Sequence, residues 1–222
     1  MAFKPEPFWT VKVCVENGNE KADFAWERGR LFDKMSCVVL YEKMLDSSEA
    51  EVKAVTRSDK KKYRPRPLNT IEFQKLASRM LKISSAKAMD IAEKLYQQGF
   101  ISYPRTETDR FTPTINLRNL VQKQSNSNDW GDYANRLLVG EQWAGPRNGP
   151  HDDKSHPPIH PVKLPDRNRL DHDMWRVYEL IARHFLGSMG KDAEGAETKV
   201  EIEIAEEIFT ARGLTVLRPN YL

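Results

Sequence analysis

The stretch from residue 99 to residue 111 constrains the fold most strongly, because a tyrosine and a proline follow directly on an amphipathic helix pattern. Apolar residues recur at helical spacing over residues 86–98. Gly99 then offers the left-handed conformation that commonly ends a helix. Pro104 fixes its own φ and favours an extended conformation for the residue before it. We therefore expect Tyr103 to be held in an extended segment where the chain leaves the helix.

The residues around Tyr103 suit a phosphoryl-transfer reaction. Positions two apart share a face of an extended chain, so we expect the Arg105 guanidinium beside the phenol. A free phenol has a pKa of about 10 and is a weak nucleophile at neutral pH. A fixed positive charge would favour its ionisation and would stabilise the transition state. The pattern predicts attack by Tyr103 on a phosphodiester; the alternative is a structural tyrosine beside a surface ion pair of Arg105 with Glu107.

The sequence from Gly99 to Thr108, GFISYPRTET, resembles the active-site motif of type IA DNA topoisomerases, and in particular of their topoisomerase III branch. The likeness continues in the same order on both sides of this motif. The flanking matches are LNT at 68–70, KLAS at 75–78, AEKLY at 92–96 and SHPPIHP at 155–161. The resemblance covers essentially the whole chain, and residues 183–186 and 213–222 look most like the eukaryotic alpha form.

This resemblance implies an ATP-independent isomerase that cleaves single-stranded DNA through a 5′-phosphotyrosine at Tyr103, passes a strand and religates. Such enzymes relax negative supercoils and decatenate intermediates of DNA recombination and repair. By the same resemblance, Arg105 would bind the scissile phosphate, His156 would assist from the other side, and Glu107 would orient Arg105 or a water. His160 departs from the pattern, since many bacterial relatives have an arginine there, and its role is left open.

Alternating polar and apolar residues at both ends of the chain predict β-strands, with helices between them. A hairpin turn is expected at Asn17-Gly18, and two further strands are expected to meet across Gly213. The predicted strands cover residues 8–15, 22–27, 51–56, 199–204, 208–211 and 214–217. The predicted helices cover residues 31–45, 70–81, 86–98, 114–124, 130–138 and a segment from Asp166 or Asn168 to Ser188.

The two helices before the tyrosine are joined by a short turn, with Thr70 and either Ser84 or Ser85 as their expected N-caps. They resemble a helix-turn-helix, although a pair of helices packed only for stability fits the same pattern. The family resemblance implies an α+β fold, in which a helical catabolite-activator-like (winged-helix-like) catalytic domain is inserted into a β-rich arch domain. The predicted division is a β-rich segment with one helix at 1–67, the tyrosine-bearing domain at 68–188, and return strands at 189–222.

Residues 57–67 hold six basic side chains and one acidic side chain, with a tyrosine and two prolines among them. We interpret this run as an extended segment that contacts the phosphate backbone of single-stranded DNA. The alternative is a solvated loop, and the net charge of +3 is too small to decide between them. The predicted DNA-binding residues are Lys60, Lys61, Lys62, Arg64, Arg66, Arg79, Lys82 and Lys154.

Residues 151–161 contain three histidines and two aspartates, yet the sequence argues against a metal site there. Prolines exclude the helix that would bring His156 and His160 onto one face, and no thiolate assists. Type IA relatives hold Mg²⁺ with acidic residues of a Toprim domain, which we do not find in this sequence. Asp171 and Asp173 fit better as the first turn of a helix. We therefore expect a fragment that lacks the Mg²⁺ ligands and is inactive alone.

The composition and the family resemblance together bound the class of protein. Charged residues make up 30% and hydrophobic residues 39% of the chain, which is typical of a globular protein. No apolar run approaches the roughly 20 residues of a membrane span, and the start at residues 1–5 is not that of a signal peptide. Cys14 and Cys37 lack CxxC partners. The resemblance implies a nuclear protein that binds single-stranded DNA, a RecQ-family helicase and an OB-fold protein. The alternative function is a non-catalytic DNA-binding module or a scaffold for partners.

Overall fold

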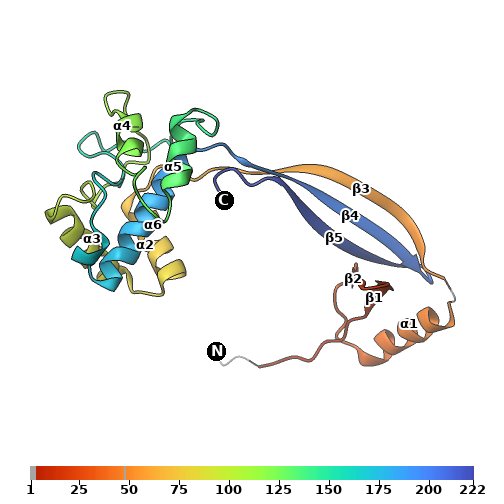
Figure 1. Cartoon of the computed structure of the whole chain (residues 1–222). Coiled ribbons are helices and arrows are strands. Elements are labelled where there is room, and N and C mark those ends of the chain that lie inside the picture. The colour runs from red at the N-terminus through yellow and green to blue at the C-terminus, as the bar shows by residue number, and fades with distance from the viewer. Residues whose placement is uncertain (1–3, 48) are drawn as a thin grey trace. The chain divides into compact units, whose positions relative to one another are not determined.

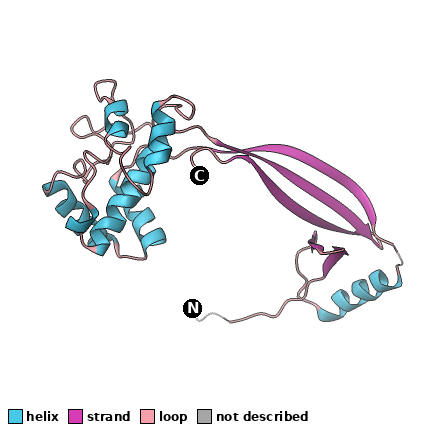
Figure 2. Cartoon of the chain, in the orientation of Figure 1, coloured by secondary structure: helices cyan, strands magenta, loops and turns pink. Residues whose placement is uncertain are grey.

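The computed structural model describes residues 4–47 and 49–222, so residues 1–3, where we expect no signal peptide, lie outside the described residues. Helices and antiparallel strands are combined, which confirms the predicted α+β class (Figure 2). By contacts the chain divides into two compact units, Met1–Lys60 with Glu194–Leu217 and Lys61–Ala193 with Arg218–Leu222. The domain boundaries expected from the family resemblance stay a prediction.

Five strands form one sheet among the described residues, in the order β1-β2-β5-β4-β3. The strands are β1 (Lys12–Asn17), β2 (Glu20–Trp26), β3 (Glu51–Lys62), β4 (Ala193–Ile204) and β5 (Glu207–Arg218) (Figure 1). The predicted hairpin at Asn17-Gly18 is confirmed, since Asn17 pairs with Glu20 and Gly18 has φ 61. The predicted turn at Gly213 is wrong. The chain turns at Ala205 and Glu206, which both have positive φ as a tight hairpin requires, and β5 continues through Gly213.

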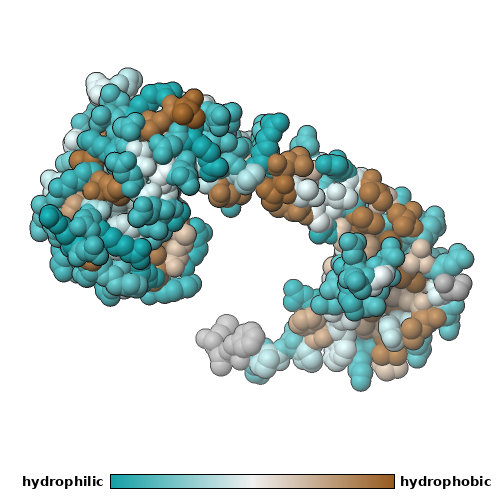
Figure 3. Space-filling view, viewed as in Figure 1, coloured by the Kyte–Doolittle hydropathy of each residue, from teal (hydrophilic) through white to brown (hydrophobic). Residues whose placement is uncertain are grey.

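The basic run that follows residue 56 is largely strand and not loop, because β3 continues to Lys62. Apolar side chains of the long strands remain exposed in the described chain, and Figure 3 shows brown atoms along this part of the molecule. The smaller core, which lies in the first unit, contains Val11, Phe24, Trp26, Cys37, Met44, Ile202 and Phe209. Helix α1 (Lys34–Asp46) begins three residues later than predicted, because the Asp33 carboxylate accepts hydrogen bonds from Met35 N and Ser36 N.

The second unit is helical and is organised around α6 (His172–Met189), whose Val177, Tyr178 and Ile181 are fully buried. The other helical elements are α2 (Thr70–Leu76), the π-helical turn η1 (Ala77–Leu81), α3 (Ser85–Gln97), α4 (Leu117–Gln122), α5 (Gly131–Leu138) and the 3₁₀ turn η2 (Arg167–Arg169). No helix among the described residues is long and apolar enough to cross a membrane.

Several helix starts differ from the prediction because a neighbouring polar side chain caps the helix. Asn69 accepts a hydrogen bond from Glu72 N and is the N-cap of α2, so the predicted cap at Thr70 is wrong. The predicted cap at Ser84 is confirmed. Helices α4 and α6 begin at Leu117 and His172, later than predicted, because Asn116 and Asp171 cap them.

The core of the second unit should respond strongly to the loss of a side chain from α3. Leu95 is fully buried in the larger hydrophobic core, so Leu95→Ala is expected to lower the free energy of unfolding by roughly 2–5 kcal/mol. Val139 lies in the same unit and is 72% exposed, so Val139→Ala should change the free energy of unfolding by less than about 0.5 kcal/mol. Urea unfolding followed by tryptophan fluorescence measures both, and equal values for the two variants would contradict this packing.

Candidate active site

Two chain segments far apart in sequence run side by side where α3 ends. Gly99 ends the helix with φ 72, as the sequence predicts. Ile101 then forms an antiparallel bridge with Pro161. Ser102 N donates to His160 O at 2.9 Å, and His160 N donates to the buried Ser102 hydroxyl at 3.0 Å. This pairing places residues 151–161 beside the segment that carries Tyr103.

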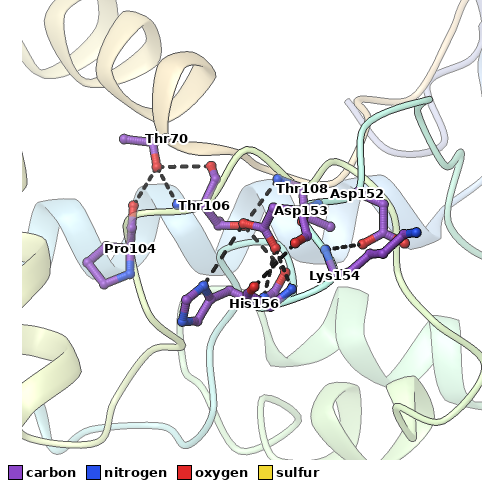
Figure 4. Close-up of polar contacts among 9 residues, drawn as sticks. Thr70, Pro104, Thr106, Thr108, Asp152, Asp153, Lys154 and His156 are labelled. Atoms are coloured by element: carbon purple, nitrogen blue, oxygen red, sulfur yellow. Dashed lines mark hydrogen bonds and ion pairs between the residues drawn. The ribbon is translucent and has the colours of Figure 1, made fainter.

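The turn after Tyr103 is fastened to the first residue of α2. The Thr70 hydroxyl donates to Pro104 O at 2.7 Å, and Thr106 N donates to the Thr70 hydroxyl at 2.8 Å (Figure 4). The backbone pairs as well, since Thr70 N donates to Thr106 O at 3.0 Å. Both sides of Arg105 are therefore held by one threonine, and the conformation of the tyrosine segment depends on α2.

The loop that carries His156 is organised by Asp153. Its Oδ1 accepts hydrogen bonds from Ser155 N at 2.9 Å and from His156 N at 2.8 Å. Its Oδ2 accepts a hydrogen bond from the Thr106 hydroxyl at 3.1 Å (Figure 4). The backbone donors, first His156 N and then Ser155 N, hold the pKa of the Asp153 carboxyl well below its usual range. The carboxylate therefore stays ionised at neutral pH and can only accept hydrogen bonds.

The half-buried Tyr103 lies among aromatic rings that limit its orientation. Its ring centroid is 4.7 Å from that of His156, with the two planes tilted by 39°. Tyr96 of α3 contacts Tyr103 from another direction, at 5.2 Å between centroids and 69° between planes. The two candidate residues Tyr103 and His156, more than fifty positions apart in sequence, are thus in ring contact.

Arg105 lies on the surface and is paired with α3. Its guanidinium Nε is 2.6 Å and its Nη2 is 2.5 Å from the Oε1 atom of Glu93. The side chain is 56% exposed, so this ion pair is weak and leaves the guanidinium able to exchange partners. The ion-pair partner of Arg105 is therefore Glu93 of α3, and not Glu107 as in the alternative of a structural tyrosine. Glu107 is exposed, and its proposed role of orienting Arg105 or a water stays a prediction. Sequence spacing suggests ion-pair partners a few residues away, whereas the fold places α3 beside the segment that carries Arg105.

A cleft of about 540 Å³ lies beside His156, on the second unit. Its lining is mixed and comprises Thr108, Arg110, Thr112, Thr114, Ile115, Asp152, Lys154, Ser155, His156 and Pro157. Lys154 is one of the predicted DNA-binding residues and is exposed. The cleft thus contains two permanent cations, Arg110 and Lys154, and one acidic side chain, Asp152.

The other predicted DNA-binding residues differ in how far they are engaged with neighbours. Lys60 pairs with Glu197 at 3.2 Å. The side chain of Arg64 is only 17% exposed, and its Nη1 lies 2.9 Å from Asp192 Oδ1. The remaining predicted residues, Lys61, Lys62, Arg66, Arg79 and Lys82, are exposed. Arg64 thus has a structural partner, while the exposed cations are available to a ligand.

The histidines and aspartates of this region each have their own partner. His151 Nδ1 is 3.0 Å from Asp109 Oδ2, and His160 Nδ1 donates to Pro158 O at 2.7 Å. Asp173 pairs with Lys87 of α3. Residues 4–47 and 49–222 contain no group of three or more histidine, cysteine or acidic side chains that could hold a metal ion. The described residues therefore do not fit a Mg²⁺ site.

Sequence reasoning missed three residues that shape this site, namely Thr70, Glu93 and Asp153. Thr70 was interpreted as a helix cap, although its hydroxyl binds the tyrosine loop. Asp153 could have been found, because an aspartate two and three residues before free backbone N–H groups commonly closes a turn. No local signal identifies Glu93, since its contact with Arg105 depends on how α3 packs.

Comparison with known proteins gives consistent matches. A family model described as DNA topoisomerase matches residues 1–222. DNA topoisomerase 3 of Caenorhabditis elegans is 45% identical over 220 residues, which is 99% of this chain and 29% of that protein. DNA topoisomerase 3-alpha of Arabidopsis thaliana is 48% identical over 225 residues, which is 100% of this chain and 24% of that protein. DNA topoisomerase 3-alpha of Homo sapiens is 47% identical over 221 residues, which is 100% of this chain and 22% of that protein. The chain therefore spans less than a third of the length of these relatives.

A solved structure agrees with these matches at the level of the fold. Full-length topoisomerase I from Thermotoga maritima superposes with a TM-score of 0.67 and 23% sequence identity. The superposition covers 97% of this chain and 35% of that one. At this identity the likeness shows a shared fold and no more.

The histidine paired with Ser102 should make stability depend on pH. Burial beside Phe111 and Phe185 lowers the pKa of His160, and Lys123 acts in the same direction. The unfolded chain takes up a proton near pH 6.5 while the folded chain resists it, so stability is lost as pH falls through and below about 6.5. His160→Asn keeps a donor for Pro158 O and should flatten this dependence, measured by urea unfolding at about pH 7.5 and 5.5. Some pH dependence of the free energy of unfolding should remain in this variant, because burial also lowers the pKa of His184. The same pH dependence in His160→Asn as in the wild type would show that His160 is not its source.

Proposed function

Since this chain belongs to the type IA DNA topoisomerase family, in its topoisomerase III branch, we propose that it carries the nucleophile of an isomerase that opens and reseals single-stranded DNA. The observation that carries this proposal is the ring contact between Tyr103 and His156, because His156 also lines the cleft that contains Arg110 and Lys154. A phenol in that position has an imidazole beside it that can exchange a proton. The chain spans less than a third of the C. elegans and human relatives, so the activity proposed is that of the complete enzyme.

The proposed reaction is a reversible transesterification. The Tyr103 oxygen bonds to phosphorus, the bond from phosphorus to the 3′ oxygen breaks, and the 5′ end remains attached as a phosphotyrosine. The phenolic proton leaves Tyr103 and a proton reaches the departing 3′ oxygen. A second strand passes before the 3′ hydroxyl attacks and restores the DNA. Since one phosphoester replaces another, no ATP is required, and the net results are relaxation of negative supercoils and decatenation of recombination intermediates.

Each neighbour of Tyr103 takes a role that follows from its chemistry. Arg105 is proposed to bind the scissile phosphate, because a guanidinium pairs well with two phosphate oxygens and its present ion pair is exposed. Glu93 holds Arg105 until DNA arrives. His156 is proposed to exchange the proton with Tyr103. Glu107 is exposed on the same segment and is proposed to orient Arg105 or a water.

The proposed domain assignment follows the family. Residues 68–188 would be the catabolite-activator-like catalytic domain, inserted into a β-rich arch domain formed by residues 1–67 and 189–222. Mg²⁺ ligands are proposed to lie outside this chain, because Asp171 caps α6 and Asp173 pairs with Lys87. The proposed setting of the complete enzyme is the nucleus, with a RecQ-family helicase and an OB-fold protein as partners in recombination and repair. These last assignments rest on the resemblance to topoisomerase III relatives.

Replacement of the nucleophile tests the proposed chemistry. This chain would replace the matching segment of the C. elegans relative, so that the chimera supplies the remaining domains. With Mg²⁺ and a 3′-labelled single-stranded oligonucleotide, quenched in SDS, Tyr103→Phe should abolish labelled protein. Its DNA affinity should fall by no more than about tenfold, because one neutral hydrogen bond contributes about 0.5–1.5 kcal/mol.

Tyr96→Phe is the matched control, since Tyr96 contacts Tyr103 but is not proposed to react. It should retain the adduct. Adduct formation by Tyr103→Phe would refute the assigned nucleophile. A loss of affinity as large as the loss of cleavage would make Tyr103 a binding residue. DNA binding by the wild-type chimera without any adduct would favour the non-catalytic module.

The end of β3 provides a test of the predicted DNA contact. Changing Lys60, Lys61 and Lys62 together to Ala should weaken binding and reduce the slope of log affinity against log salt by up to about 2, since each phosphate contact on a single strand contributes about 0.7. Restoring Lys60 alone should change little, because Lys60 is paired with Glu197. Lys53→Ala is the control on the same strand, where Lys53 pairs with Glu51. Identical slopes for the triple variant and the control would make this end of β3 a solvated surface.

A further inference from the structure

We propose that Asp153 is a positioning residue, which sets the distance between Tyr103 and His156 and acts on DNA cleavage through His156; its effect on cleavage rests on the function proposed above. Asp153 binds both loops of the site. Its Oδ1 receives the backbone N–H groups of Ser155 and His156, and its Oδ2 receives the hydroxyl of Thr106, three residues after the nucleophile. One carboxylate therefore joins the loop of the nucleophile to the loop of the histidine.

The hydrogen bonds around Asp153 leave little freedom on either side. Thr106 is itself fixed, because its N–H donates to Thr70 and its hydroxyl accepts Thr108 N at 3.1 Å. The Thr108 hydroxyl in turn accepts Asp153 N at 3.0 Å. Figure 4 shows these contacts converging between the two loops. Movement of Asp153 would therefore release the His156 loop from the tyrosine segment.

Only an ionised carboxylate satisfies all of these donors. Three donors point at the two oxygens, and a carboxamide could accept them on its oxygen but not on its nitrogen. Asp153 also lies on the Nδ1 side of His156, with Oδ2 at 4.0 Å from Nδ1. That distance is too long for a direct hydrogen bond, so the carboxylate acts on His156 through the backbone N–H that it accepts.

The consequence for the reaction is a defined path for one proton. As the Tyr103 oxygen bonds to phosphorus and the bond to the 3′ oxygen breaks, the phenolic proton moves to the Nε2 atom of His156 and from there to the 3′ oxygen. Asp153 contacts neither the phenol nor the DNA in this scheme. It holds the imidazole ring in place through the backbone N–H groups of the His156 loop.

The first test is structural and does not require activity. Contacts between the ring protons of Tyr103 and His156 would be measured by NMR in the full 222-residue chain. They should persist in Asp153→Asn, which keeps an acceptor for the two backbone N–H groups, and be lost in Asp153→Ala. Asp166→Ala is the control, because Asp166 also closes a turn by accepting a backbone N–H, that of Asn168, but belongs to η2. Unchanged ring contacts in Asp153→Ala would overturn the inference.

The second test measures cleavage in the chimera described above. Asp153→Ala should lower the rate of adduct formation by about 100-fold, the low end of what a general acid–base group contributes, and Asp153→Asn by about tenfold. DNA affinity should change little in both. In a His156→Ala background the change at Asp153 should have no further effect, because the two residues act as one unit. A full additional loss in that background would overturn the inference.

The two tests separate failure of the inference from failure of the proposed function. If Asp153→Ala loses the ring contacts yet cleaves normally, Asp153 positions His156 and the proposed role of His156 in cleavage is wrong. Normal cleavage by His156→Ala would likewise show that the proposed role of His156 in cleavage is wrong. If Asp153→Ala keeps the contacts between the Tyr103 and His156 rings but cleaves more slowly, Asp153 acts by another route and the inference is wrong.

Discussion

The pairing of residues 100–102 with residues 158–162 is the constraint on which the candidate site depends. Ser102 is buried, and both its backbone and its hydroxyl are bound to the opposite segment. Buried polar groups are costly unless they are bonded, so this register cannot slip without leaving donors unpaired. Tyr103 and His156 come from the two paired segments just beyond this register. The backbone pairing therefore brings the two segments side by side, and the hydrogen bonds of Asp153 then hold the His156 loop against the tyrosine segment.

Charge at the site is arranged in two layers that differ in strength. The inner layer is the Asp153 carboxylate, which is fixed by backbone N–H groups and a threonine hydroxyl. The outer layer is exposed and consists of the Arg105–Glu93 pair and of Lys154 in the cleft. Exposed pairs contribute little to stability and exchange partners easily, whereas the inner carboxylate holds backbone in place. Under the proposed function, phosphate would bind at the outer layer while the geometry of the inner layer is kept.

The sequence matches extend over the whole chain, although the chain is less than a third of each relative described. The helical unit holds the tyrosine and its neighbours on its own, since all of them lie within residues 61–193. The described residues supply no cluster for a divalent cation. Under the proposed function, this chain would contribute the nucleophile and its positioning groups, and other parts of the complete enzyme would contribute the metal chemistry.

The sequence alone determined the features that depend on near neighbours. It identified the helix end at Gly99, the hairpin at Asn17-Gly18 and the tyrosine motif, because backbone preferences and short motifs act over a few residues. Tertiary structure alone decided that Glu93 pairs with Arg105, that β3 continues to Lys62, and that Asp153 joins the two loops. Asp153 and Thr106 are 47 residues apart, and side-chain periodicity carries no information about which distant segments pack together. Burial and hydrogen bonding fix those partners only when the whole unit folds.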